Sequence, residues 1–312
     1  MTRADIRLQA WFLSAFVTRV IKAPPLELTT RQVAEPELVT VPTRHGPVRC
    51  FITRGAADTP LAQHTGAPPV HINIHGGAFL IGAPRQDDHL VRAMAGEAGA
   101  TVVNVDYSTA PKARYPQAHQ ECYDVLDWVR RSGSTMGWDD QRVSIGGGSA
   151  GGNLALGALE LARQAGDSAV RTCILVVPSV DQTIAPEQYS SPMPPGAGRA
   201  ARPFVSPRLV RVMQETYFTD ASRRAEPLAS PLLGDEEIAS LPPLLVIAAE
   251  QDSLRPQIEQ LVTKARSKSV PVTYQCFAGV DHDFPVRPKA GTEPALRELA
   301  NLMCTHLIKH LA

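Results

Sequence analysis

One serine stands inside a cluster of glycines in the stretch VSIGGGSAGGNLALGALELA, residues 143–162. Counted from Gly147, the stretch matches G-x-S-x-G, a sharp turn from a strand into a helix that presents a serine nucleophile. Counted from Gly146, it matches G-x-G-x-x-G, a turn that binds the pyrophosphate of a dinucleotide. The same residues therefore fit two chemistries, acyl transfer by Ser149 or the binding of a nucleotide cofactor.

The dinucleotide interpretation needs partners that the chain does not offer in the expected places. In that fold the glycine turn follows the first strand, and an acidic residue at the end of the next strand binds the ribose. Here several strand-like segments precede the turn, and Asp181 lies late for the acidic role. A third interpretation is structural, since glycines also let a strand and a helix pack closely. We favour a nucleophilic Ser149 at a helix N-terminus, where developing negative charge is stabilised.

A second glycine pair, Gly76 and Gly77, follows the apolar segment PPVHINIH. Their backbone N–H groups are unobstructed by side chains and can point at the oxyanion that forms during acyl transfer. The N–H of Ala150, directly after the serine, supplies a third donor. We predict that these three residues form an oxyanion hole, and that His75 braces the loop without transferring a proton. The alternative is an ordinary Gly-Gly turn.

Strand-like segments, rich in apolar and β-branched residues, alternate with helix-like segments along most of the chain. The strand-like segments are 37–43, 47–54, 68–75, 100–107, 141–147, 171–178, 241–250 and 271–277. The helix-like segments include 87–98, 150–164, 294–311 and the stretch from Pro116 through Val129. This alternation predicts a mostly parallel sheet covered on both faces by helices.

The N-terminal stretch MTRADIRLQAWFLSAFVTRVIK has a short apolar centre, Ala10–Val17, followed by Arg19. A signal peptide would end in small residues at a cleavage site, so we predict an amphipathic helix instead. Its apolar residues stand largely at helical spacing and are Ile6, Trp11, Phe12, Phe16 and Val20. No apolar stretch approaches the roughly 18 residues that would span a bilayer, so we expect no membrane insertion.

The charge and cysteine content give no support for several classes of function. Lysine plus arginine and aspartate plus glutamate both number 31, so the net charge gives no support for binding nucleic acid or anionic membranes. The cysteines are scattered without a C-x-x-C pair, at Cys50, Cys122, Cys173, Cys276 and Cys304. Free thiols in a reducing cytosol explain this pattern better than disulfides or a metal site. We expect a cytoplasmic protein with no bound metal and no cofactor.

Five segments occur along the chain in this order: HGGAF, VDYSTAPKARYPQAHQECYDVLDWV, GGGSAGGNLA, LPPLLVIAAEQDSLR and FAGVDHDF. Together they resemble the hormone-sensitive-lipase-like family of α/β-hydrolase carboxylesterases, over roughly residues 45–310. The resemblance implies an α/β-hydrolase fold, with a mostly parallel central sheet flanked by helices and a helical cap. Two residues depart from the family pattern: Ala78 replaces a frequent glycine, and Gly148 replaces the usual aspartate. Ala78 keeps its N–H for the oxyanion hole, and Gly148 leaves the nucleophile intact.

A serine hydroxyl becomes a good nucleophile only when a base removes its proton and an acid orients that base. In α/β-hydrolases the chain order is serine, acid, histidine. After Ser149 the chain offers Glu250 and Asp252 at the end of an apolar segment, and the resemblance selects Asp252. His282, in a loop before the last helix, lies where the resemblance puts the base. The alternatives without a catalytic role are a helix N-cap for Asp252 and a solvated loop residue for His282.

The resemblance also implies a cap over the site. We assign residues 1–44 to an N-terminal cap segment and residues 45–312 to the catalytic domain. The abundance of Pro, Gly and Ser in most of residues 182–218 indicates an insertion, and the resemblance implies that it forms a second part of the cap. Candidate walls of the substrate pocket, each also suited to the core, are Trp11, Phe16, Phe79, Phe204, Met213, Tyr217 and Phe284.

We therefore predict a serine carboxylesterase that hydrolyses small to medium acyl esters through an acyl-enzyme. Its partner is a small-molecule ester, and the protein is a monomer or homodimer. Two alternatives from other classes remain. One is an NAD-type dinucleotide-binding enzyme that uses the overlapping glycine pattern. The other is a non-catalytic small-molecule receptor on a hydrolase scaffold, which typically lacks a triad member that this chain retains.

Overall fold

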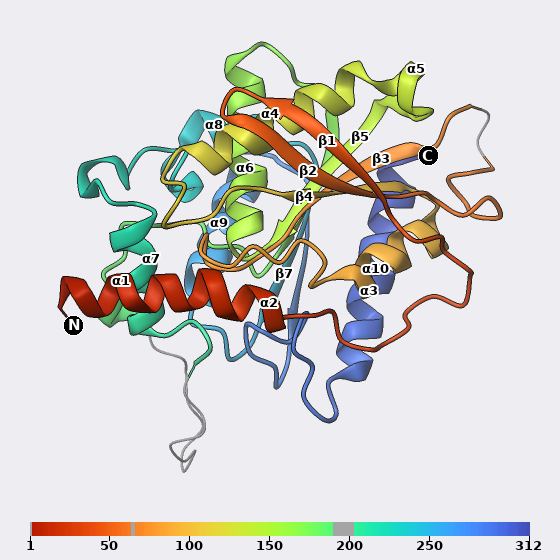
Figure 1. Cartoon of the computed structure of the whole chain (residues 1–312). Helices are drawn as coiled ribbons and strands as arrows, with labels where there is room; N and C mark the ends of the chain where they lie inside the picture. Colours follow the sequence, from red (N-terminus) through yellow and green to blue (C-terminus); the bar gives the residue numbers. More distant parts are fainter. Residues whose placement is uncertain (1, 64–65, 190–202) are drawn as a thin grey trace.

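A mostly parallel sheet forms the centre of the protein (Figure 1). The computed structural model describes residues 2–63, 66–189 and 203–312. The eight strands follow the order β1-β2-β4-β3-β5-β6-β7-β8, with β1–β2 and β2–β4 antiparallel and the other neighbours parallel. The predicted parallel sheet is confirmed, and each predicted strand segment overlaps one strand. Their bounds are β1 Glu37–Thr43, β2 Gly46–Thr53, β3 Pro69–Ile74, β4 Thr101–Asp106, β5 Asp139–Gly148, β6 Val170–Val176, β7 Leu244–Ala249 and β8 Val272–Phe277.

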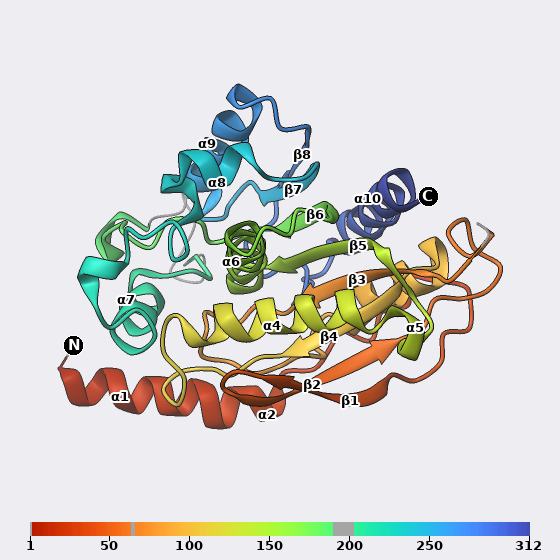
Figure 2. The same ribbon diagram turned by 90° about the horizontal axis from the view of Figure 1, so that it is seen from above.

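Helices cover both faces of this sheet (Figure 2). On one face α4 (Gln117–Arg131) and α6 (Ala150–Gln164) pack side by side, and α9 (Arg255–Ser267) packs on β7 and β8. On the other face lie α10 (Glu293–Leu311), α3 (Asp88–Ala93) and its π-helical continuation η2 (Met94–Ala98). The remaining helices are α1 Arg3–Phe12, η1 Leu13–Val17, α2 Thr18–Val20, α5 Gly133–Met136, η3 Pro186–Gln188, α7 Pro207–Thr216, η4 Ala221–Arg223, η5 Pro231–Leu233 and α8 Asp235–Ala239.

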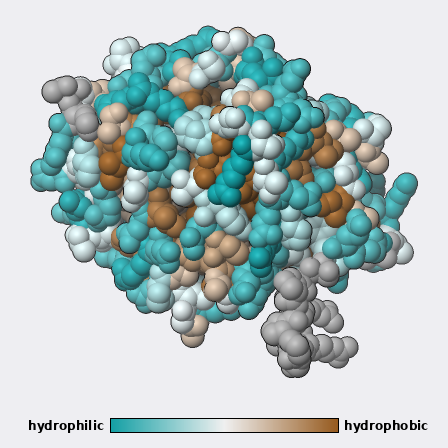
Figure 3. All heavy atoms as spheres, turned by 180° about the vertical axis from the view of Figure 1, so that it is seen from behind, coloured by the Kyte–Doolittle hydropathy of each residue, from teal (hydrophilic) through white to brown (hydrophobic). Residues whose placement is uncertain are grey.

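The core is the sheet itself. Every residue of β3 and β7 is buried, as parallel strands covered on both faces require. Each fully buried Val, Leu or Ile contributes about 1.5–3 kcal/mol relative to its exposed state, so these strands add strongly to the stability of the fold. Figure 3 shows one outer face, where hydrophobic residues reach the surface only as separate patches between hydrophilic ones. The parallel strands all point their carboxyl ends at one edge of the sheet, where loops can bring distant residues together.

The N-terminal segment lies beside α7, outside the sheet (Figures 1 and 2). Thr2 and Asp5 form a capping box that starts α1, so the predicted helix is confirmed. Only Ile6 of the predicted apolar stripe is buried, together with Ala10. The other four members of the stripe are exposed: Trp11, Phe12, Phe16 and Val20.

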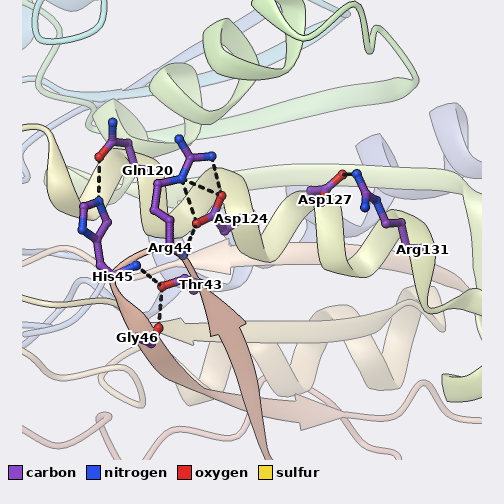
Figure 4. A network of polar contacts seen from close by, with 8 residues as sticks. All are labelled: Thr43, Arg44, His45, Gly46, Gln120, Asp124, Asp127 and Arg131. Atoms are coloured by element: carbon purple, nitrogen blue, oxygen red, sulfur yellow. Dashed lines mark hydrogen bonds and ion pairs between the residues drawn. The ribbon is translucent and has the colours of Figure 1, made fainter.

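The edge hairpin of β1 and β2 is fastened to α4 by polar contacts (Figure 4). The guanidinium of Arg44 donates to both carboxylate oxygens of Asp124, with an Nη2–Oδ1 distance of 2.7 Å. The backbone N–H of Arg44 donates to Asp124 Oδ2 at 2.8 Å, and His45 Nε2 lies 2.6 Å from Gln120 Oε1. The Asp124 side chain is only 14% exposed, so it connects the hairpin to the helix layer from a largely buried position.

Replacing Asp124 should therefore cost more stability than replacing a carboxylate that pairs only within the helix. Asp124→Ala removes the contacts to Arg44 and should lower the free energy of unfolding by about 1–2 kcal/mol. Asp127→Ala, which breaks only the exposed ion pair with Arg131 on the same helix (Figure 4), should cost about 0.3–0.5 kcal/mol. Urea denaturation of both variants measures the difference. Equal losses would contradict a special role for the hairpin contact.

Candidate active site

Ser149 sits in a strained turn between β5 and α6. Its φ is 54° and its ψ is −114°, a conformation that costs a residue with a side chain about 1–3 kcal/mol. The surrounding backbone holds the turn in place: the Ser149 N–H donates to the carbonyl of Val176 at 2.9 Å. The Ser149 carbonyl accepts from the N–H of Ser179 at 3.1 Å. The predicted strand-to-helix turn at Ser149 is therefore present.

Glycines let this turn lie directly on the neighbouring strands. A Cβ at Gly147 would lie 2.3 Å from the carbonyl oxygen of Ile74, and a Cβ at Gly151 would lie 1.9 Å from the same atom. A Cβ at Gly146 would lie 2.4 Å from the carbonyl oxygen of Ile174. Two of the three glycines in the dinucleotide pattern, Gly146 and Gly151, thus face strand backbone. Close packing of the helix on the strand is also the role of the third glycine in a dinucleotide turn, so these contacts fit both glycine patterns.

The structure brings Ser149, His282 and Asp252 together from the loops after β5, β8 and β7. His282 Nε2 lies 2.9 Å from Ser149 Oγ, and His282 Nδ1 lies 2.7 Å from Asp252 Oδ2. The other carboxylate oxygen, Asp252 Oδ1, accepts from the N–H of Leu254 at 2.9 Å, in the turn before α9. Asp252 therefore fixes both this turn and the imidazole. Glu250 was the other candidate for the acid, but its side chain accepts from the N–H of Gly279 instead.

The environment of His282 favours its protonated form. Burial alone lowers the pKa of a histidine, but the Asp252 carboxylate beside the ring, with Asp281 and Asp283 nearby, outweighs this effect. The pKa of His282 is consequently raised above its ordinary value. The ring of Phe204 stacks on the imidazole with centroids 5.8 Å apart, and the N–H of Phe204 donates to Asp281 Oδ2. The imidazole of His282 can accept the proton of Ser149 only when the imidazole itself is neutral.

The loop after β3 approaches the nucleophile closely. A Cβ at Gly76 would lie 3.4 Å from the Cβ of Ser149, and Gly77 has a φ of +133°. Ala78 adopts a φ of 53°, a left-handed conformation that glycine takes at lower cost, which fits the frequent glycine of the resembled family. In the described ranges, the backbone N–H groups of Gly76, Gly77 and Ala150 donate to no acceptor. These three groups are available to an oxyanion at Ser149.

Buried polar residues hold this loop. His75 Nδ1 donates to the carbonyl of Gly76 at 2.7 Å, and Gln86 Nε2 donates to the same oxygen at 3.1 Å. Tyr107 Oη donates to the carbonyl of His75, and burial lowers the pKa of His75 to about 4. A neutral, fully buried His75 thus braces the loop, as its place in the sequence suggests. Gln86 was missed, because it belongs to no motif and reaches Gly76 only after the chain has turned back.

A pocket opens at Ser149 and His282 and continues between the sheet and the segment 204–213. Three of the predicted wall residues line it, namely Phe79, Phe204 and Met213. The N-terminal segment contributes Ile21 to the lining. The part of the predicted insertion at 190–202 lies outside the described residues.

The other four predicted wall residues do not line this pocket. Tyr217 and Phe284 belong to the core, where Tyr217 stacks on Phe79 and Phe284 packs on Phe277. Trp11 and Phe16 are 60% and 54% exposed, so they lie on the outer side of the N-terminal helix. That helix turns Ile6 and Ala10 inward, and this rotation carries the two aromatic residues away from the pocket.

Comparisons with known proteins agree with this geometry. A family model described as the alpha/beta hydrolase fold matches residues 71–286. The chain is 30% identical over 257 residues to an ethyl acetate hydrolase of Pseudomonas putida, covering 80% of this chain and 76% of the relative. It is 28% identical over 283 residues to the esterase LipI of Mycobacterium tuberculosis, covering 90% and 85%.

The fold is also that of solved esterase structures. A thermostable esterase from Pseudomonas putida ECU1011 aligns with a TM-score of 0.79 and 27% identity, covering 100% of this chain and 91% of that one. An esterase from Pyrobaculum calidifontis aligns with a TM-score of 0.76 and 28% identity, covering 99% and 92%. These matches confirm the predicted fold class and the resemblance drawn from the sequence motifs. The chain belongs to the α/β-hydrolase family, in the hormone-sensitive-lipase-like group that its five motifs predict.

Proposed function

We propose that this protein is a serine carboxylesterase that hydrolyses small to medium acyl esters. The observation that carries the proposal is the continuous hydrogen-bonded chain from Asp252 through His282 to Ser149. Beside it lies a loop whose Gly76 and Gly77 N–H groups donate to no acceptor among the described residues. Relatives named as an arylesterase of Saccharolobus solfataricus, an ethyl acetate hydrolase and an acetyl-hydrolase of Streptomyces hygroscopicus support ester substrates.

In the proposed mechanism, Ser149 Oγ attacks the ester carbonyl carbon while its proton passes to His282 Nε2. The negative charge that develops on the carbonyl oxygen is stabilised by the N–H groups of Gly76, Gly77 and Ala150. His282 then gives the proton to the departing alcohol. The acyl group remains bound to Ser149 as an acyl-enzyme. A water molecule, deprotonated by His282, attacks this ester and releases the acid. Asp252 holds the Nδ1–H throughout and stabilises the protonated ring.

The cap is part of the proposal. Residues 182–218 would form one part, supported by Val205, Leu209 and Met213, which line the pocket from the described portion of that segment. Residues 1–44 would form the other part, supported by the packing of α1 on α7. Thr18 Oγ1 also accepts from the N–H of Gly82 at 3.2 Å, next to the oxyanion loop. A closed cover excludes water and adds contacts to the substrate.

The proposed partner is a small-molecule ester, and the proposed enzyme is a monomer or homodimer. Its proposed place is the cytoplasm, because scattered cysteines such as Cys50 and Cys276 are typical of a reducing compartment. Within residues 2–63, 66–189 and 203–312, none of the helices combines the length and hydrophobicity that a bilayer crossing needs. Among the contacts that the structure describes at the site, none favours the dinucleotide enzyme or the non-catalytic receptor over the esterase.

Removing the nucleophile tests the proposal directly. Ser149→Ala should lower the hydrolysis of p-nitrophenyl acetate by about 10⁵–10⁶-fold, because only binding and the oxyanion hole remain. A fluorophosphonate probe should label the wild type at Ser149 and leave the variant unlabelled. Ser144→Ala is the matched control, since Ser144 also contacts a histidine, His71, but on a buried face of the sheet. Labelling that followed another serine would refute the assignment.

The pH profile tests the base. A protonated His282 cannot accept the serine proton, so kcat/KM should rise with pH through the pKa of His282. Because this pKa is raised, the inflection should lie above the ordinary value of about 6.5 for histidine. Asp281→Asn should move the inflection down, since Asp281 is one of the carboxylates that favour the protonated ring. A profile that stayed flat from about pH 5 to 9 would exclude His282 as the base.

Shortening the N-terminus tests the cap. Deleting residues 1–25 removes Ile21 from the pocket wall, so kcat/KM for a hexanoate ester should fall roughly tenfold more than for an acetate. Ile21→Ala should change the same ratio in the same direction, and serves if the shortened protein does not fold. Leu8→Ala is the control, because Leu8 is 66% exposed on the outer side of α1. If the hexanoate-to-acetate ratio stays constant in both altered proteins, the N-terminal segment is no cap.

A further inference from the structure

The pocket does not end at Ser149 but continues along the sheet face that α3 and α10 cover. Its lining there comes from β3, β6, α10 and the beginning of α3. We name this part the inner chamber and define it by His71, Asn73, Asp87, Leu90, Ile174 and Met303. None of these residues takes part in the proposed acyl transfer.

Missing side chains on β5 make space for the chamber. The parallel register sets Asn73 of β3 and Ile174 of β6 on either side of Gly146, whose Cβ would collide with backbone. Gly148 is different: a Cβ there would meet nothing closer than the carbonyl oxygen of Val176, at 3.8 Å. The backbone therefore tolerates a side chain at 148, yet the chain has glycine where the resembled family usually has aspartate.

The missing side chain at 148 would point toward the chamber. Successive residues of a strand alternate between its two faces, so Ser144, Gly146 and Gly148 share one face of β5. Ser144 Oγ lies 2.8 Å from His71 Nδ1, and a Cβ at Gly146 would lie 3.1 Å from the His71 ring. This face is thus the one that carries His71. Gly148 also lines the pocket next to Ser149, so its lack of a side chain leaves a passage from the nucleophile to the chamber.

The chamber contains a carboxylate oxygen without a partner. Asp87 is 9% exposed, and its Oδ2 accepts from Asn73 Nδ2 at 3.0 Å, while Asn73 Nδ2 also donates to Asn104 Oδ1. Asp87 Oδ1 is buried and has no hydrogen-bond partner among the described residues. Burial raises the pKa of Asp87 to about 6, against the hydrogen bonds of Asn73 and Asn104, which lower it. In its ionised form the carboxylate can only accept hydrogen bonds. Leaving such an acceptor unpaired is costly, and a donor from a ligand would remove that cost.

We propose that the inner chamber recognises esters whose acyl chain or alcohol chain carries a neutral hydrogen-bond donor, such as a hydroxyl group, that reaches Asp87. This inference rests on the proposed esterase function and names its substrate class. Leu90, Ile174 and Met303 offer apolar contacts to the aliphatic part of the chain. A plain alkyl end would leave the carboxylate unpaired, so the chamber discriminates against it.

Two series of esters distinguish which side of the substrate enters the chamber. The first pairs p-nitrophenyl ω-hydroxyalkanoates of six to eight carbons, which do not readily close to lactones, with the corresponding alkanoates. The second pairs the monoacetates of diols with the acetates of alkanols of equal length. In one series, kcat/KM should favour the hydroxylated ester by about 10–100-fold at the chain length that reaches Asp87, the range expected for a hydrogen bond to a charged group. A preference in neither series contradicts the inference.

Variants assign the preference to Asp87. Asp87→Asn replaces an acceptor oxygen with a donor and should reduce the preference to within about threefold, whereas Asp88→Asn should retain it. Asp88 is the matched control, because it pairs with Arg85 at 2.6 Å and does not line the pocket. Gly148→Val should close the passage and abolish the preference, which gives a second readout if Asp87→Asn does not fold. A preference that survived Gly148→Val would contradict the inference.

The two proposals fail in different ways. If no ester in either series is hydrolysed, or if Ser149→Ala hydrolyses them as well as the wild type, the esterase function is wrong. If hydrolysis depends on Ser149 but the hydroxylated and plain esters react equally, only the chamber inference is wrong. Melting temperatures of the variants, measured beside the kinetics, separate a loss of recognition from a loss of fold.

Discussion

The close contact between the serine turn and β3 is the constraint on which the site depends. The carbonyl oxygen of Ile74 lies 2.3 Å from the position of a Cβ at Gly147 and 1.9 Å from that of a Cβ at Gly151, so the turn and the first residues of α6 rest directly on this strand. This contact also brings the loop after β3 to the nucleophile, with Gly76, two residues after Ile74, beside Ser149. One close approach between two backbones thus sets the positions of both the serine hydroxyl and the N–H donors.

The acid and the base depend on a second connection, between the loops after β7 and β8. Glu250 accepts from the N–H of Gly279, and the N–H of Gln251 donates to the carbonyl of Val280. These bonds hold the two loops together before the side chains of Asp252 and His282 meet. Asp252 then uses one oxygen for the turn into α9 and the other for the imidazole. A residue that fixes backbone and base at once ties the geometry of the site to the stability of the fold.

Local signals made the central features predictable. Buried parallel strands are continuous apolar runs, and the glycines around Ser149 are required by contacts within a few ångströms, so both leave a direct mark on the sequence. The choice between Glu250 and Asp252 needed the family resemblance, because two acids at the end of one strand look alike until the neighbouring loop is placed. Trp11 and Phe16 could not be assigned, since helical spacing predicts a stripe but not the direction it faces. That direction depends on packing against a distant segment, since α1 packs on α7 and buries Ile6 and Ala10.

Around the inner chamber, neighbouring glycines occur for different structural reasons. In the run Gly146–Gly147–Gly148, the first two residues are glycine because backbone fills the space of a side chain, whereas at Gly148 that space is open. Polar residues within a buried strand, such as His71 and Asn73, give no signal of their own, because most buried polar groups merely satisfy one another. Asp87 differs in a way that only its surroundings reveal, since one of its oxygens is satisfied by Asn73 and the other by nothing in the described chain. A missing side chain beside the nucleophile and an unpaired acceptor farther along the same face become meaningful together, because the first gives a ligand access to the second.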